Sequence, residues 1–140
     1  MQPKIVLDTN CLLQILGANS KYHYLFQKFL QNKFVLCLSS DILLEYEEIL
    51  TQKASAVATD MFLKVIAYST NTIRKEPFFC FNLIEKDKDD NKFVDCAIVS
   101  NANYIVSDDK HFNILQTIPF PHVEVKRLIE FSAEIASSQS

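Results

Sequence analysis

Three short apolar runs, each followed closely by an acidic residue, constrain the fold of this chain more than any other feature of its sequence. The runs lie within Lys4 to Asp8, Phe34 to Leu38 and Tyr104 to Ser107. Continuous apolar runs of this length are typical of strands buried on both faces, as in a parallel sheet covered by helices. Segments with helical spacing separate the runs, so the sequence predicts an α/β fold with a central parallel sheet.

Helical patterns fill most of the remaining chain. The spacing of apolar residues predicts helices over residues 11–16, 22–31, 42–50, 54–71 and 127–135, and further helices that begin near Asp90 and Asp109. A final edge strand is expected over residues 122–125. In the 54–71 segment we expect Val57, Met61 and Phe62 to face the core. The length fits a single domain over residues 1–135, followed by a frayed polar tail over residues 136–140.

The composition is typical of a globular protein, with 49% apolar residues and no segment long enough to span a membrane. The cysteines form no C-x-x-C pair and no cluster with histidine, so neither a zinc site nor a disulfide framework is indicated. They are Cys11, Cys37, Cys80 and Cys96. We expect four buried thiols in a reducing compartment, and a cytoplasmic protein that does not contact membranes.

Acidic residues follow the strands or begin the helices at four places. Asp8 and the pair Asp108-Asp109 come directly after strands, Glu45 lies on the helix after the second run, and Asp90 begins a helix. Each acid alone has a structural explanation, since aspartate is a common helix cap. In open α/β sheets, however, ligands bind at the carboxyl ends of strands, where these acids are expected to converge.

Spacing separates the acids that share a helix. On the 42–50 helix, Glu48 falls opposite the apolar arc, whereas Glu45 and Glu47 flank its edges. Glu45 is also nearer the start of the helix, and hence nearer the end of the preceding strand. Asp95 lies about 140° around its helix from Asp90. We therefore expect Asp95 either to support the site indirectly or to be an ordinary polar position.

The clustered carboxylates predict a site for Mg²⁺ or Mn²⁺ rather than for zinc, because these cations prefer oxygen ligands. Such ions support the hydrolysis of phosphate esters. The formal net charge of −3 does not argue against a nucleic-acid substrate, since the chain without four site carboxylates carries +1, and bound cations reverse the sign that a phosphate meets. A Gly-rich phosphate loop is absent from the sequence, which argues against P-loop chemistry.

Four motifs follow one another in the order of a known family pattern. The first two are VLDTN at Val6 to Asn10 and SDILLEY at Ser40 to Tyr46. The last two are DKDDNKF at Asp87 to Phe93, followed by Ala97, and YIVSDDKHF at Tyr104 to Phe112. They resemble, in turn, the first-strand motif, the helices of the second and third acids, and the closing T-x-D motif of PIN domains of the kind found in bacterial toxin–antitoxin toxins. The resemblance covers nearly the whole chain. It implies a three-layer α/β/α sandwich, a Mg²⁺- or Mn²⁺-dependent ribonuclease, and a homodimer inhibited by an antitoxin protein.

The resemblance also implies roles for individual residues. Asp8, Glu45 and Asp90 match the first three acids of the family pattern. The hypothesis is an endoribonuclease for single-stranded RNA in which Asp8, Asp90 and Asp109 hold one or two metal ions. Glu45 would complete the site or position the attacking water.

Two adjacent residues, Asp108 and Asp109, compete for the position of the fourth acid. The T-x-D pattern maps onto Ser107 to Asp109 and selects Asp109. Asp108 stands where the family usually has a small residue, and it is kept as the alternative. Ser107 keeps the hydroxyl of the family threonine, and Asn10 is expected to orient Asp8 by hydrogen bonding.

Two other functions fit parts of the pattern. One is another Mg²⁺-dependent phosphoryl hydrolase or phosphoacceptor, but Asn10 replaces the second aspartate of a phosphatase D-x-D motif. The other is a non-catalytic module that binds nucleic acid or protein on the same fold, although the presence of all four acids argues against lost catalysis. For the aromatic run Phe78 to Phe81 we favour core packing or a subunit interface over base stacking.

Overall fold

The central sheet of the computed structural model, which describes residues 2–85 and 87–137, consists of parallel strands. The strands are β1 (Lys4–Leu7), β2 (Val35–Leu38), β3 (Thr72–Arg74), β4 (Tyr104–Val106) and β5 (Val125–Lys126). Their order across the sheet is β3-β2-β1-β4-β5, and each neighbouring pair is parallel. The predicted parallel sheet is confirmed, with β1 at its centre.

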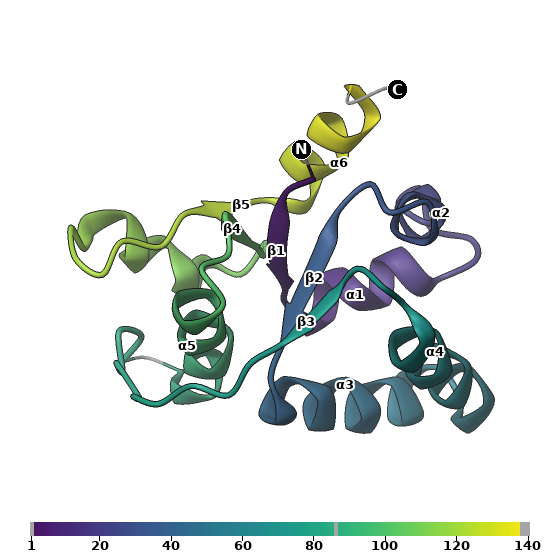
Figure 1. The fold of residues 1–140 in the computed structure, drawn as a ribbon, viewed down its shortest axis with the longest axis horizontal. Helices are drawn as coiled ribbons and strands as arrows, with labels where there is room; N and C mark the ends of the chain where they lie inside the picture. Colours follow the sequence, from purple (N-terminus) through teal and green to yellow (C-terminus); the bar gives the residue numbers. More distant parts are fainter. Residues whose placement is uncertain (1, 86, 138–140) are drawn as a thin grey trace.

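Helices cover both faces of this sheet. They are α1 (Thr9–Leu16), α2 (Tyr24–Leu30), α3 (Ser40–Lys53), α4 (Ala56–Tyr68), α5 (Asn91–Val99) and α6 (Leu128–Ser137), with 3₁₀ helices η1 (Lys88–Asp90) and η2 (Lys110–Thr117). Figure 1 shows α5 on one side of the sheet and α1, α2 and α4 on the other. Helix α5 packs against β1, β2 and β4, and α2 packs against α6. The expected three-layer α/β/α arrangement is therefore confirmed.

Burial explains which elements the sequence revealed. The side chains of Ile5 and Val6 in β1 are fully buried, and β4 is buried throughout, as expected for continuous apolar runs. Strand β3 was not predicted because it has only three residues and lies at the sheet edge, where Arg74 is exposed. The helix predicted over residues 54–71 ends at Tyr68, and the next residues lead into this strand.

Several expectations about burial are wrong. Val57 and Met61 are 75% and 58% exposed, because α4 packs on α3 and covers only a narrow stripe that includes the buried Phe62. Cys80 is exposed, unlike the other three cysteines. Phe78 is 88% exposed, so the aromatic run does not belong to the core, and its alternative role as a subunit interface stays a prediction.

The carboxyl-terminal elements differ from prediction only at their ends. The expected edge strand is β5 at Val125–Lys126, and the closing helix α6 extends to Ser137, two residues beyond its predicted end. Residues 138–140 of the predicted tail lie outside the described residues. Within the part of the chain that is described, no helix has both the length and the apolar character needed to cross a membrane.

Asn71 connects the end of α2 to the beginning of β2. Its buried side chain donates hydrogen bonds to the carbonyl oxygens of Phe29, at 2.8 Å, and Phe34, at 2.9 Å. Asn71→Ala would leave two carbonyls without this donor, and we expect the free energy of unfolding to fall by about 2 kcal/mol. Urea denaturation measures the effect. The control is Thr70→Ala, which changes the exposed neighbouring residue. Equal stabilities of the two variants would contradict the prediction.

Candidate metal centre

The carboxyl ends of β1 and β4 meet where the strand order reverses direction. The chain proceeds from β1 to β2 and β3 on one side, then returns to β4 and β5 on the other. Leu7 is paired with Val106, and the backbone N–H of Asp8 donates to the Val106 carbonyl at 3.0 Å. Asp8 and Ser107 therefore lie side by side at the type of crevice where α/β sheets bind ligands.

Asp8 is buried and held in one orientation. The Ser107 hydroxyl donates to Asp8 Oδ2 at 2.7 Å, and the backbone N–H of Thr9 donates to Oδ1 at 2.8 Å. Burial raises the pKa of Asp8, its hydrogen bonds lower it, and the charges of Asp109 and Glu45 raise it, with a net upward shift. The carboxylate is thus fixed in place beside two other acids.

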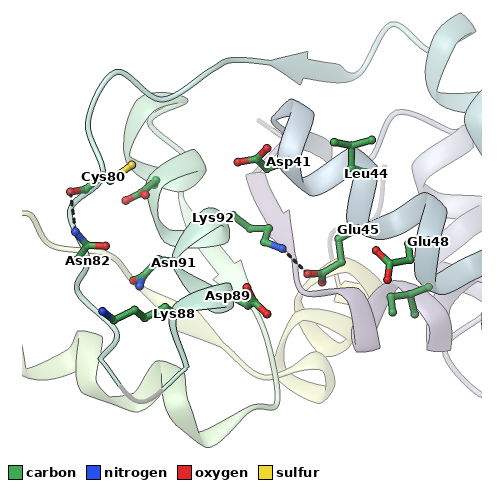
Figure 2. Close-up of a pocket in the computed structure, with 12 residues that line it drawn as sticks. Asp41, Leu44, Glu45, Glu48, Cys80, Asn82, Lys88, Asp89, Asn91 and Lys92 are labelled. Atoms are coloured by element: carbon green, nitrogen blue, oxygen red, sulfur yellow. Dashed lines mark hydrogen bonds and ion pairs between the residues drawn. The ribbon is translucent and has the colours of Figure 1, made fainter.

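Glu45 reaches the site from α3, where neighbouring residues fix its position. Its carboxylate accepts hydrogen bonds from the Thr9 hydroxyl and, at 2.6 Å, from Lys92 Nζ on α5. Figure 2 shows Lys92 extending from α5 toward Glu45 on α3. The hydroxyl of the fully buried Tyr46 donates to the Leu7 carbonyl at 2.5 Å and ties α3 to β1. The sequence placed Glu45 at the site but gave no signal for the ion pair with Lys92.

Asp90 is the most unusual acid of the group. It lies at the junction of η1 and α5, is only 8% exposed, and among the described residues its side chain makes no capping hydrogen bond. Helix capping therefore does not explain this acid. Its Oδ2 is buried without a hydrogen-bond partner among the described residues. Burial, together with the charges of Asp87, Asp109 and Asp8, raises the pKa of Asp90 to about 6.

Asp109 begins η2 and connects it to the site. Its Oδ1 accepts from the backbone N–H of His111 at 2.9 Å, and its own N–H donates to the Ser107 hydroxyl at 3.0 Å. The side-chain Nδ1 of His111 lies 3.5 Å from both Asp109 Oδ1 and Asp90 Oδ2. Asp87, Asp90 and His111 each place one ligating atom within 4.8 Å of the others. Sequence reasoning missed Asp87 and His111, although both lie within the motifs quoted above.

The structure distinguishes Asp109 from its neighbour. Asp108 is exposed, and its Oδ1 accepts the backbone N–H of Leu128 at 3.0 Å, at the start of α6. Asp109, in contrast, is the neighbour whose charge raises the pKa of both Asp8 and Asp90. Asp109 is therefore in closer electrostatic contact with the other acids.

The structure gives the surroundings of two further polar residues that the sequence singled out, Asn10 and Asp95. Asn10 is exposed and lines a hollow beside Asp8, whose hydrogen bonds come from Ser107 and the Thr9 backbone instead. Asp95 is buried, and its Oδ1 accepts the backbone N–H of Phe81 at 3.1 Å. Asp95 thus holds the aromatic segment against α5.

Several hollows of the surface adjoin the acids. One of about 670 Å³ lies between α3 and the η1–α5 segment and is lined by Glu45, Lys88 and Lys92 (Figure 2). A second, of about 410 Å³, is lined by Asp8 and Asp109. A third, of about 420 Å³, is lined by Ser107, Asp109 and Lys110.

The donor set fits a divalent cation. Several carboxylates whose charges act on one another lie together, and a buried polar atom such as Asp90 Oδ2 is costly unless a partner satisfies it. A cation that accepts oxygen ligands would both neutralise the cluster and supply this partner. Among the described residues, the ligating atoms that lie close enough together to share one ion come from Asp87, Asp90 and His111, whereas Asp8 and Asp109 act on Asp90 through their charges.

Comparison with protein families identifies the class to which this fold and site belong. Residues 4–111 match the family model of the PIN domain, so the chain belongs to the PIN domain family. No curated protein sequence matches it.

Three of the solved structures that share this fold come from bacteria. A chain in the crystal structure of VapBC2 from Rickettsia felis, bound to a DNA fragment from its promoter, has a TM-score of 0.61 at 16% identity, covering 89% of this chain and 98% of that one. The structure of VapC20 of Mycobacterium tuberculosis, a sarcin-ricin loop cleaving toxin, has a TM-score of 0.58 at 14% identity, covering 86% of this chain and 98% of that one. The structure of FitAcB from Neisseria gonorrhoeae has a TM-score of 0.55 at 14% identity, covering 89% of this chain and 98% of that one. At these identities the likeness concerns the fold.

Proposed function

We propose that this protein is a Mg²⁺- or Mn²⁺-dependent endoribonuclease that hydrolyses phosphodiester bonds in single-stranded RNA. The observation that carries the proposal is the buried Asp90 carboxylate, which has an oxygen without a hydrogen-bond partner among residues 2–85 and 87–137 and lies within the electrostatic reach of Asp8 and Asp109. A cluster of carboxylates at this position is costly for the fold, and a cation that it binds for catalysis would offset that cost.

In this proposal Asp8, Asp90 and Asp109 hold the metal. A divalent ion bound there would supply Lewis-acid chemistry, making water more acidic and balancing the charge that develops on phosphate. Ser107 and the Thr9 backbone keep both oxygens of Asp8 oriented. Lys92 and the Thr9 hydroxyl hold Glu45 at the edge of the cluster, where its carboxylate would position the attacking water or complete the ligand set.

The preference for a single strand rests on access. A scissile phosphate must approach Asp90, which is only 8% exposed, and a flexible strand can enter such a recess more readily than a stiff duplex. Lys88 lines the adjoining hollow and would contact a phosphate beside the cleavage point, while the acids that line the same hollow, among them Asp41 and Asp89, would need bound cations before a phosphate could approach.

We further propose that the protein is the toxin of a toxin–antitoxin pair and forms a homodimer. The fold likeness to VapC20, a sarcin-ricin loop cleaving toxin, supports this role. Phe78 and Phe79 are 88% and 70% exposed, and such aromatic side chains are typical of protein interfaces. We assign them to the dimer surface.

A cleavage assay tests the proposed function. Purified protein without an affinity tag is incubated with a mixed-sequence single-stranded RNA in Mn²⁺, in Mg²⁺ and in chelator. The same RNA annealed to its complement, and single-stranded DNA of the same sequence, serve as alternative substrates. We expect metal-dependent cutting of the single-stranded RNA alone, and none by the Asp8→Asn/Asp90→Asn double variant.

The outcomes of this assay are distinct. Cutting that persists in chelator or in the double variant would contradict the proposal and indicate a contaminating nuclease. RNA binding without cleavage in every condition would instead support a non-catalytic binding module on this fold.

A further inference from the structure

We infer that His111 is a direct nitrogen ligand of the metal held at Asp90, and that this ligand makes the site prefer Mn²⁺ to Mg²⁺. The inference rests on the proposed function and deepens it, because it adds an imidazole to a site that the sequence describes as purely carboxylate. Asp87 is assigned as a further oxygen ligand from the same cluster.

Two buried atoms that face each other carry the inference. His111 Nδ1 and Asp90 Oδ2 lie 3.5 Å apart, and neither has a hydrogen-bond partner in the described part of the chain. An imidazole and a carboxylate that served each other would be expected at about 2.7–2.9 Å. Buried polar atoms are rarely left unsatisfied in proteins, and an ion is one of the few groups that can satisfy both a carboxylate oxygen and an imidazole nitrogen.

The spacing of these atoms suits a shared cation. Ligands about 2.1 Å from an octahedral ion lie about 3.0 Å apart when adjacent and about 4.2 Å apart when opposite. The separation of 3.5 Å between His111 Nδ1 and Asp90 Oδ2 falls inside this range. The ligating atoms of Asp87, Asp90 and His111 lie within 4.8 Å of one another, so inward movements of a few tenths of an ångström would complete the set.

The backbone around His111 holds the imidazole in this position. Its N–H donates to Asp109 Oδ1 at 2.9 Å, which fixes the first turn of η2. The next residue, Phe112, is fully buried and packs edge-on against Phe93 of α5, with 6.4 Å between ring centroids. A ligand anchored on both sides loses little conformational entropy when it binds a metal.

The chemistry of imidazole determines the predicted selectivity. Mg²⁺ is held by carboxylates and water and gains little from nitrogen. Mn²⁺ also prefers oxygen ligands but, as a first-row transition ion, gains more from an added imidazole than Mg²⁺ does. A site that contains His111 should therefore bind Mn²⁺ more tightly than an all-oxygen site would. Mg²⁺ affinity should depend only on the carboxylates.

Metal binding and electron spin echo spectroscopy test the inference without reference to catalysis. Tag-free protein is titrated calorimetrically with Mn²⁺ or Mg²⁺ alone, and the Mn²⁺ complex is examined for ¹⁴N modulation from a coordinated nitrogen. We expect this modulation in the native protein. His111→Asn should lose it and bind Mn²⁺ more than about 100-fold more weakly, since the loss of a group that only orients a ligand already costs about 10–100-fold. Its Mg²⁺ affinity should stay within about threefold of the native value.

A second histidine provides the matched control. His122 is exposed and its Nε2 lies 2.9 Å from Glu124, on a loop before β5, so His122→Asn should retain both the modulation and the Mn²⁺ affinity. Bound Mn²⁺ without ¹⁴N modulation in the native protein, or modulation that persists in His111→Asn, would overturn the inference and leave the nuclease proposal standing. Absence of any divalent-ion binding, together with absence of RNA cleavage, would overturn both.

Discussion

Replacing Asp8 by asparagine is expected to reduce metal-dependent RNA cleavage by more than about 100-fold while the fold stays intact. The loss of a group that merely orients a ligand typically costs about 10–100-fold, and a direct ligand should cost more. Asparagine can keep both hydrogen bonds, because its amide oxygen accepts from Thr9 N–H and the Ser107 hydroxyl can accept from its amide nitrogen. Initial rates on a fluorescent single-stranded RNA, with circular dichroism as a check on folding, measure the effect.

Asp108→Asn is the matched control for this experiment. It removes the same charge from the adjacent loop, but from a carboxylate that accepts the Leu128 N–H at the start of α6. We expect its cleavage rate to stay within about threefold of the native rate, since asparagine retains an oxygen that can cap the helix. A loss as large as that of Asp8→Asn would make Asp108 the fourth acid. Full activity in Asp8→Asn would remove Asp8 from the site.

Asp90→Asn is expected to abolish cleavage and, at the same time, to stabilise the metal-free protein. The pKa of Asp90 is raised to about 6 by burial and by neighbouring acids, from an ordinary value of 3.8. Between these two values the folded state binds more protons than the unfolded state, so stability falls as pH rises from about 4 to about 6. Above that range the ionised carboxylate destabilises the fold, and asparagine removes this cost.

The pH dependence of the melting temperature distinguishes this explanation from others. In chelator at pH 7.5 we expect Asp90→Asn to melt at least about 2 °C above the native protein, and this difference should vanish near pH 4. Mn²⁺ should raise the melting temperature of the native protein but have little effect on the variant. Asp89→Asn removes the exposed neighbouring charge. This variant should melt at the same temperature as the native protein in chelator and should respond to Mn²⁺ as the native protein does. A variant less stable than the native protein at pH 7.5 would show that the Asp90 charge is favourably paired.

The main features of the fold could be predicted because its central strands are buried on both faces. Strands β1, β2 and β4 appear in the sequence as continuous apolar runs, whereas β3 has three residues and is a strand only because Leu36 and Cys37 of β2 pair with it. Helix burial was predicted less well where a helix packs on another helix. In α4 the apolar periodicity is correct, but the partner α3 covers only part of the predicted face.

The site was predictable in its positions but not in its contacts. Acids that follow strands could be placed from the order of elements alone. The sequence could not reveal that Lys92 reaches Glu45 across 47 positions, or that a histidine two residues after Asp109 turns its Nδ1 toward Asp90. These contacts depend on how the side chains of separate elements meet, which spacing along one element does not encode.

The unequal burial of the cysteines provides a way to observe the site optically. Cys80 is the exposed member of the four and lines the hollow between α3 and α5. Burial raises the pKa of Cys11 and Cys37, and that of Cys96 to about 12, so these thiols are poor nucleophiles at neutral pH. A maleimide dye would therefore label the native sequence at one place, on the rim of the hollow. Its fluorescence could report the arrival of RNA in real time, without any substitution in the protein.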